Sequence, residues 1–114
     1  MKISRPEVLQ GTLDLMVLKA LSSMGPLHGY GIARRIEQIS EAELKLNEGT
    51  VYASLLRLAG RGWISSAWGI SENNRKARFY SITKSGQKRL ARETEMWERA
   101  AALVGRVLRF ETRK

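Results

Sequence analysis

The chain has 114 residues, with 20 Lys and Arg against 11 Asp and Glu, a net charge of +9 and no cysteine. This length allows one domain with a modest core, and the lack of cysteine excludes disulfides and thiolate chemistry. A basic chain of this kind indicates a polyanionic partner, either nucleic acid or an anionic membrane surface. Most of the excess lies in residues 75–114, which carry 12 basic and 4 acidic side chains.

Other classes of protein are disfavoured. The most apolar stretch, residues 13–24, contains Asp14 and Lys19 and is too short and too polar to cross a bilayer. Because the start of the chain also lacks the pattern of a signal peptide, we expect a cytoplasmic protein that does not enter a membrane. A single histidine, no metal-spaced cluster and no phosphate-cradling glycine loop argue against an enzyme, and we predict no metal and no cofactor.

Two helices are predicted in the first part of the chain. Residues 12–24 have apolar side chains over more than half of the helical circumference, which indicates a central helix buried on several sides. Gly25 and Pro26 end it. A second helix begins near His28, which we interpret as a structural residue of the helix start rather than a sensor or ligand. Residues 41–46 connect this helix to the next.

Residues 47–62 predict a third, short helix. Asn47 is a good N-cap, Val51, Leu55 and Leu58 recur at helical spacing, and glycines follow at 60 and 62. The residues off this apolar stripe are hydroxyl side chains and an arginine rather than a Glu and Lys mixture: Thr50, Tyr52, Ser54 and Arg57. Hydroxyls suit phosphate oxygens, and arginine suits a phosphate or a guanine edge, so this face is a candidate DNA-binding surface. An ordinary solvated helix face is the alternative.

A β-hairpin is predicted after the third helix. Residues 63–68 and 77–82 are β-prone, and the stretch between them is rich in turn residues. Arg75, Lys76 and Arg78 make the hairpin basic. Three short helices followed by a basic hairpin predict a winged helix-turn-helix, mainly α with a small β-hairpin, although a plain hairpin with solvated charges would have the same composition.

The last predicted element is a long helix from the N-cap Thr83 to about Phe110. Its apolar residues recur at near-heptad spacing, and we assign a dimerisation seam to Leu90, Trp97, Ala101, Val104 and Leu108. We therefore expect residues 1–82 to form a DNA-binding domain and residues 83–114 a dimerisation helix that pairs with a second copy. Packing back on the same domain, or lying on a membrane surface, are the alternatives.

Five segments of the chain resemble the PadR-type winged-helix transcriptional regulators, in the short form with a single C-terminal dimerisation helix. The segments are LQGTLD (9–14), GPLHGYGI (25–32), NEGTVY (47–52), RGWI (61–64) and FYSITKSG (79–86). They follow the family's order and spacing from end to end. The chain departs from the family's pattern at Ala53, where many relatives have proline, and at Ala59 and Gly60, where the pair is usually more polar.

The resemblance implies a homodimer that binds a palindromic operator in double-stranded DNA and represses transcription until an effector weakens binding. It places Asn47, Thr50, Tyr52, Ser54 and Arg57 at DNA from the third helix, and Arg75, Lys76 and Arg78 from the wing. It also makes Trp97 a candidate contact for a small planar aromatic effector, although a tryptophan on a seam is more often an interface residue. A non-specific architectural DNA binder and a protein-binding adaptor are the rival functions.

Overall fold

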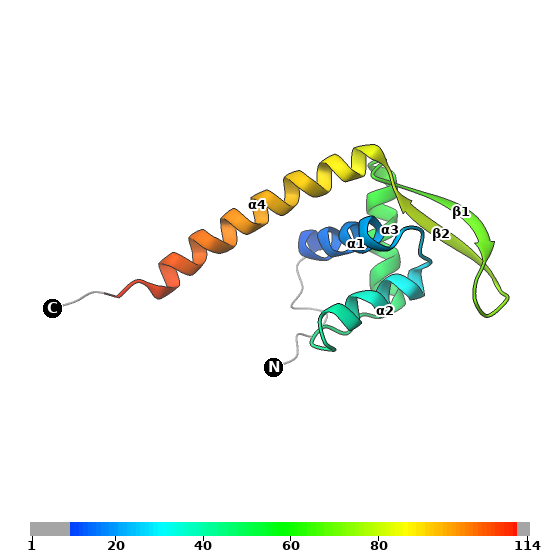
Figure 1. The fold of residues 1–114 in the computed structure, drawn as a ribbon, viewed down its shortest axis with the longest axis horizontal. Coiled ribbons are helices and arrows are strands. Elements are labelled where there is room, and N and C mark those ends of the chain that lie inside the picture. The colour runs from blue at the N-terminus through cyan, green and yellow to red at the C-terminus, as the bar shows by residue number, and fades with distance from the viewer. Residues whose placement is uncertain (1–9, 112–114) are drawn as a thin grey trace.

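The computed structural model describes residues 10–111. Its order is α1 (Gln10–Met24), α2 (Gly29–Ile39), α3 (Glu48–Gly60), β1 (Ile64–Ile70), β2 (Lys76–Ile82) and α4 (Lys84–Arg109). The first three helices form a body, the β1–β2 hairpin extends from one side of it, and α4 projects away on the other (Figure 1). The molecule is correspondingly elongated, at 66 × 31 × 20 Å. The predicted winged helix-turn-helix with a long C-terminal helix is confirmed.

Side-chain caps explain where three of the helices begin. The Asn47 Oδ1 atom accepts a hydrogen bond of 2.7 Å from the Thr50 amide, and the Thr83 Oγ1 atom accepts one of 3.0 Å from the Gly86 amide. His28 Nδ1 accepts a bond of 3.0 Å from the Gly31 amide, which makes His28 the N-cap of α2. Each cap satisfies an amide that the helix itself leaves without a partner. The expected starts near residues 28, 47 and 83 are therefore confirmed.

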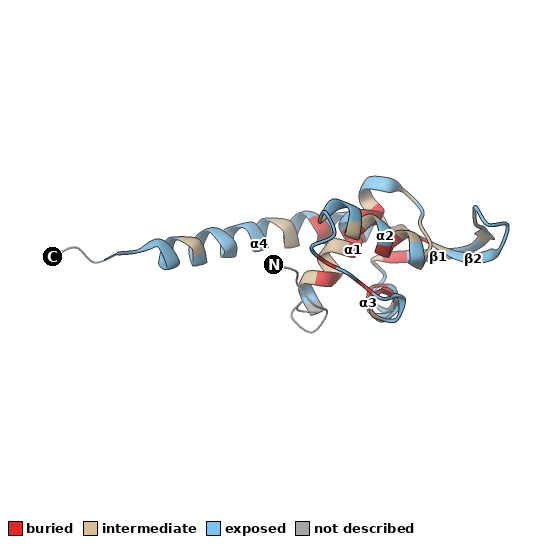
Figure 2. Ribbon diagram, turned by 90° about the horizontal axis from the view of Figure 1, so that it is seen from below, coloured by how far each residue is buried: buried red, intermediate tan, exposed pale blue. Residues whose placement is uncertain are grey.

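The core forms where α2, α3 and the root of the hairpin meet α1. The fully buried side chains include Val17, Leu21, Ile32, Leu55 and Leu58, which come from all three helices. In Figure 2 the buried residues gather in this body, whereas the outer part of α4 is mostly exposed. Because α1 contacts α2, α3, α4 and β2, the prediction that it is the central helix is confirmed.

The connection between α2 and α3 is held by polar side chains of α2 and its C-cap. Ser40 Oγ accepts a hydrogen bond of 3.1 Å from the Leu44 amide, and Glu37 Oε2 accepts one of 3.2 Å from the Leu46 amide. Leu44 and Leu46 are themselves buried in the core. The connection therefore fixes the position at which α3 begins relative to α2.

The hairpin is antiparallel, with Ile64 opposite Ile82 at its root and Trp68 opposite Arg78 farther out. Both strands extend slightly beyond the predicted ranges toward the tip. Leu27, in the α1–α2 connection, exchanges two backbone hydrogen bonds with Tyr80, at 3.1 and 2.8 Å. This pair joins the hairpin to the body and sets its angle relative to α2.

The first turns of α4 pack on the body and the remainder projects outward. Gly86 lies against the carbonyl oxygen of Trp63 so closely that a Cβ atom would clash there. Leu90 is buried, at 7% exposure, within the chain's own core. The assignment of Leu90 to an intermolecular seam is therefore corrected, because its side chain is already covered by the same chain.

None of the helices in residues 10–111 is long and apolar enough to span a membrane.

Candidate nucleic-acid interface

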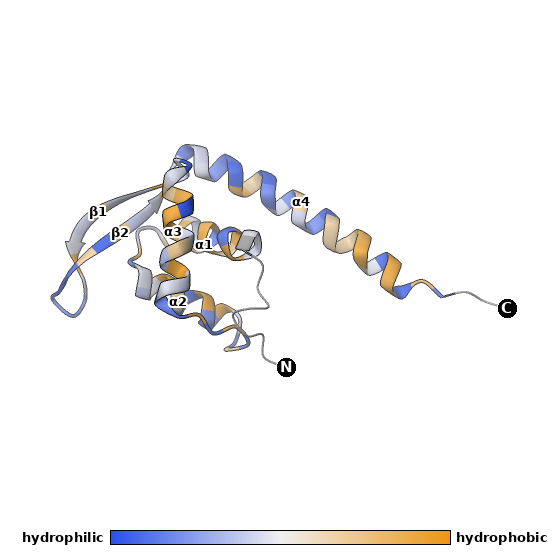
Figure 3. Ribbon diagram, turned by 180° about the vertical axis from the view of Figure 1, so that it is seen from behind, coloured by the Kyte–Doolittle hydropathy of each residue, from blue (hydrophilic) through white to orange (hydrophobic). Residues whose placement is uncertain are grey.

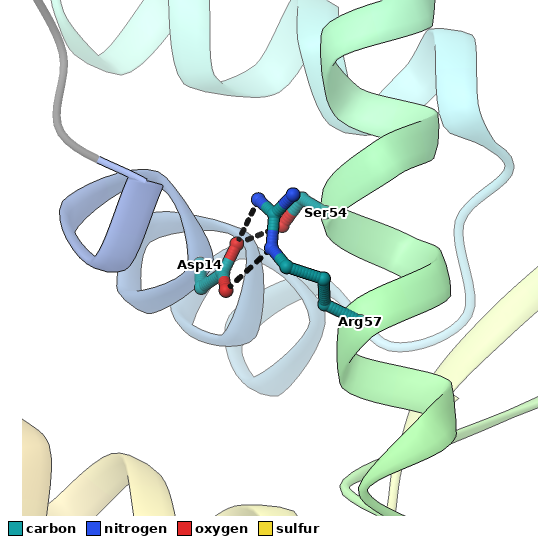
Figure 4. A network of polar contacts seen from close by, with 3 residues as sticks. All are labelled: Asp14, Ser54 and Arg57. Carbon is teal, nitrogen blue, oxygen red and sulfur yellow. Dashed lines mark hydrogen bonds and ion pairs between the residues drawn. The ribbon is translucent and has the colours of Figure 1, made fainter.

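Two of the predicted DNA contacts on α3 point into the protein instead. Ser54 is fully buried, and its hydroxyl donates a hydrogen bond of 2.6 Å to Asp14 Oδ1 on α1. The Arg57 guanidinium grips the same carboxylate with two hydrogen bonds, 3.1 Å from Nε to Oδ2 and 2.7 Å from Nη2 to Oδ1 (Figure 4). The assignment of Ser54 to the DNA surface is wrong, because no solvent reaches its side chain.

Arg57 retains limited exposure, at 27% of its side chain, against 15% for Asp14. Hydrogen bonding to the Asp14 carboxylate, which accepts from the guanidinium, raises the pKa of Arg57 above its ordinary value, while burial acts in the opposite direction. A pair of charge-assisted hydrogen bonds between one guanidinium and one carboxylate is strong and directional. Arg57 therefore joins α3 to α1, and its predicted contact with DNA is not supported by its position.

The remaining predicted residues of α3 lie at its exposed N-terminal end. Tyr52 is 53% exposed. Asn47 is exposed, but its carboxamide oxygen already accepts bonds from the Thr50 amide and from Thr50 Oγ1, the latter at 2.9 Å. Asn47 and Thr50 therefore shape the start of the helix, and Tyr52 is the one predicted α3 residue whose ring is largely free on the surface.

The outward face of α3 contains residues that the sequence interpretation did not select. The exposed positions of α3 are Glu48, Gly49, Tyr52, Ala53, Leu56, Ala59 and Gly60. Leu56 is 57% exposed, although it directly follows the buried Leu55. The spacing of Glu48, Tyr52 and Leu56, four residues apart, is the signal that could have identified this face, because such residues lie one above another on a helix.

The hairpin carries the three predicted cations on its exposed surface. Arg75, Lys76 and Arg78 are all exposed. Trp68, which was not predicted as a site residue, lies close to two of them: its ring centroid is 5.1 Å from Lys76 Nζ and 5.0 Å from Arg78 Cζ. Cations over a tryptophan face gain electrostatic attraction from the ring. Trp68, itself 60% exposed, thus limits where the two basic groups can move.

A groove of about 630 Å³ separates the N-terminal half of α3 from the hairpin. Tyr52 and Leu55 line it on the α3 side, and Lys76, Arg78 and Tyr80 on the hairpin side. Burial raises the pKa of the Tyr80 hydroxyl, and the nearby Arg78 cation acts in the opposite direction. The exposed Tyr52 ring and the cationic strand edge thereby face one shared hollow, a geometry suited to a polyanion that enters between them.

The outer half of α4 has exposed apolar side chains. Trp97, Val104 and Leu108 from the predicted seam are 53%, 54% and 78% exposed, and Ala101 is exposed as well. Further large apolar residues on the same part of the helix are exposed by more than half: Met96, Leu103 and Val107. Figure 3 shows hydrophobic colouring concentrated in this outer part of α4. A contiguous apolar surface of this kind is typical of an interaction site.

No cluster of three or more His, Asp or Glu side chains in the part of the chain that the structure describes could hold a metal ion.

Comparison with known sequences gives a match to the family described as "Transcriptional regulator PadR-like family" over residues 17–92.

Solved structures with the same fold include transcriptional regulators from several bacteria. A transcriptional regulator from Clostridium thermocellum is 29% identical, with a TM-score of 0.78 over 91% of this chain and 96% of that chain. A PadR-like regulator from Bacillus cereus is 24% identical, with a TM-score of 0.76 over 91% of this chain and 98% of that one. PadR from Bacillus subtilis, solved in complex with operator DNA, is 23% identical, with a TM-score of 0.63 over 72% of this chain and 46% of that chain.

Proposed function

Because the chain belongs to the PadR-like family of transcriptional regulators, we propose that it acts in the cytoplasm as a homodimeric repressor that binds a palindromic operator. One observation carries this proposal: the exposed face of α3 and the cationic edge of the hairpin border the same groove. The groove combines a helix that can enter the major groove with cations that can reach the flanking phosphates. The B. subtilis relative solved with operator DNA gives the proposal a precedent in the same fold.

Some of the proposed contacts position the protein on the DNA, and others read the base sequence. Arg75, Lys76 and Arg78 neutralise phosphates, which fixes the register of the protein on the duplex without reading bases. Tyr52 reaches into the major groove from α3. Asn47 and Thr50 hold the N-terminus of α3 in shape.

The proposed homodimer uses the outer half of α4. Trp97, Ala101, Val104 and Leu108 are spaced by four, three and four residues, which is the spacing of a helix–helix seam. A two-fold pair of such helices buries this face and leaves both copies of α3 on one side of the dimer. For binding to successive major grooves, the two α3 helices must lie roughly 34 to 36 Å apart.

We assign the DNA-reading function to residues 1–82 and the dimer contact to residues 83–114. A small planar aromatic effector that stacks on Trp97 would change how the two α4 helices meet. Because the first turns of α4 pack on α1, such a change would move the α3 helices relative to each other and weaken operator binding. This is the proposed route to derepression.

The test is selection of bound sequences from a random pool of duplex DNA by the purified protein, with light scattering on the same sample. We expect a palindromic motif and the mass of a dimer. Binding without sequence preference would replace the repressor with an architectural DNA-binding protein. Absence of DNA binding, with a basic surface this extensive, would favour an adaptor for an acidic protein.

A further inference from the structure

The outward face of α3 lacks the side chains that most often read bases by hydrogen bonding. Arg and Lys read guanine, and Asn and Gln read adenine, through paired bonds in the major groove. The exposed α3 positions 48, 49, 52, 53, 56, 59 and 60 hold none of these residue types. Arg57, the one arginine in α3, is committed to Asp14 through both Nε and Nη2.

The same face offers apolar contact at its centre. Leu56 is 57% exposed and lies one helical turn from Tyr52 and from Ala53 on the side away from the core. Glu48 is the charged member of the face, and its carboxylate disfavours close approach of a phosphate to this part of the helix. The chemistry that remains for Leu56 in a major groove is contact with the C5-methyl group of thymine.

We propose that Leu56, with Ala53 beside it, reads thymine methyl groups, so that A·T pairs carry the sequence preference of each half-site. This inference rests on the proposed function and names what the α3 face recognises. DNA is the partner because Tyr52, one helical turn before Leu56 on the same face, lines a groove whose hairpin wall carries Arg75, Lys76 and Arg78 against the single acidic residue Glu72. Charge complementarity of this kind brings phosphates to the hairpin and thereby places base edges opposite Leu56.

The experiment uses the operator obtained by selection and a series of duplexes in which one thymine at a time is replaced by deoxyuridine. The replacement removes the C5-methyl group and keeps the hydrogen-bonding pattern of the pair. For the wild-type protein we expect binding to weaken about fourfold at one or more positions, as for loss of one buried methyl group. For Leu56→Ala we expect the ratio of the affinity for the thymine duplex to the affinity for the deoxyuridine duplex to fall toward 1.

Ile39→Ala is the matched control, because Ile39 is an equally exposed aliphatic residue, at 61%, located on α2 away from the groove. This variant should keep the wild-type ratio of thymine to deoxyuridine binding. Thermal unfolding of Leu56→Ala should match that of the wild type, since the side chain is mostly in solvent.

Two results would overturn the inference and leave the proposed function intact. One is a wild-type protein that prefers its operator but binds every deoxyuridine duplex as tightly as the thymine duplex. The other is a Leu56→Ala variant that keeps the full wild-type ratio, because methyl recognition would then belong to another side chain. A wild-type protein that selects no motif would instead remove the proposed function and this inference together.

Discussion

Ser54 and Arg57 on α3 differ from Arg75, Lys76 and Arg78 on the hairpin in what surrounds their polar groups. The α3 pair lies against Asp14 of α1, 40 and 43 residues earlier in the chain, and is wholly or largely withdrawn from solvent. The hairpin cations are exposed, with no ion pair to an acidic side chain identified for them in residues 10–111. Similar residue types thus stabilise the fold in one region and remain available for a partner in the other.

Whether a polar side chain supports the fold or stays available for a partner therefore depends on the nearest opposite charge in space. Asp14 stands in the most apolar stretch of the sequence, where an isolated carboxylate requires a partner. Once α1 crosses α3, that partner is Arg57 (Figure 4). The hairpin has exposed strands at the edge of the molecule, so its cations meet solvent or a ligand.

The largest effect is expected from breaking the α1–α3 network. Asp14→Ala leaves the Arg57 guanidinium and the buried Ser54 hydroxyl without their acceptor, and should lower the free energy of unfolding by about 2 to 3 kcal/mol. Urea denaturation measures this change. The control is Glu95→Ala, which removes an exposed ion pair to Arg99 and should cost less than about 0.5 kcal/mol. Equal losses in both variants would mean that the network is no stronger than a surface pair.

The second prediction concerns the hairpin cations. Arg75→Ala combined with Lys76→Ala should leave the free energy of unfolding within about 0.5 kcal/mol of wild type, because both side chains are exposed. Operator affinity should fall, and the slope of log affinity against log salt should become shallower by about 0.9 for each lost phosphate contact.

Binding measured over a range of salt concentrations checks this second prediction. Arg57→Ala provides the contrast: it should lower stability and should leave the salt slope as in wild type. If Arg57→Ala also made the slope shallower, Arg57 would contact phosphate despite its bonds to Asp14.

A smaller effect is expected from Trp68. Trp68→Ala removes the ring that holds Lys76 and Arg78, and each exposed cation–π contact contributes about 0.5 to 1 kcal/mol. We expect operator binding to weaken several-fold with both cations still present. Trp68→Phe keeps an aromatic face and should recover most of the loss in the same binding assay. A Trp68→Ala protein that binds as wild type does would show that the ring has no part in placing the cations.

Much of the fold follows from local signals in the sequence. Asn47 and Thr83 are caps that act within three residues of themselves, and the apolar periodicity of residues 12–24 needs no distant partner to be recognised. The exposed basic hairpin was also predictable, because a two-stranded sheet has little buried space for charged side chains. These features depend on near neighbours in the chain.

The candidate site could be predicted only in part, since its remaining features depend on contacts between distant segments. Ser54 lies three residues after Val51 and four before Leu58, so its helical position is on the buried face that α1 covers, and its polar residue type led to the wrong prediction. Leu90 fits a heptad with Trp97 and Val104, yet the body of the same chain buries it. Leu56 is the reverse case, an apolar residue left outside. Periodicity along α3 therefore separates Ser54 from Leu56, whereas the packing of α4 on α1 decides the exposure of Leu90, and periodicity along α4 does not contain that information.

The smallest effect concerns Tyr80, a buried residue at the point where the hairpin meets the body. Titration of its hydroxyl should change the free energy of unfolding with pH. Burial raises the pKa of Tyr80, with Arg78 opposing the shift, above the ordinary tyrosine value of about 10. From pH 10 up to the folded pKa, the folded protein keeps a proton that the unfolded chain has lost, so the stability present below pH 10 declines as pH rises.

Urea unfolding of wild type and Tyr80→Phe at increasing alkaline pH tests this, and the variant should lose stability less steeply. Tyr30→Phe, which removes a phenol that is 52% exposed, is the control and should follow the wild-type slope. A Tyr80→Phe protein that declined as steeply as wild type would mean that burial does not raise the pKa of Tyr80 in the folded protein.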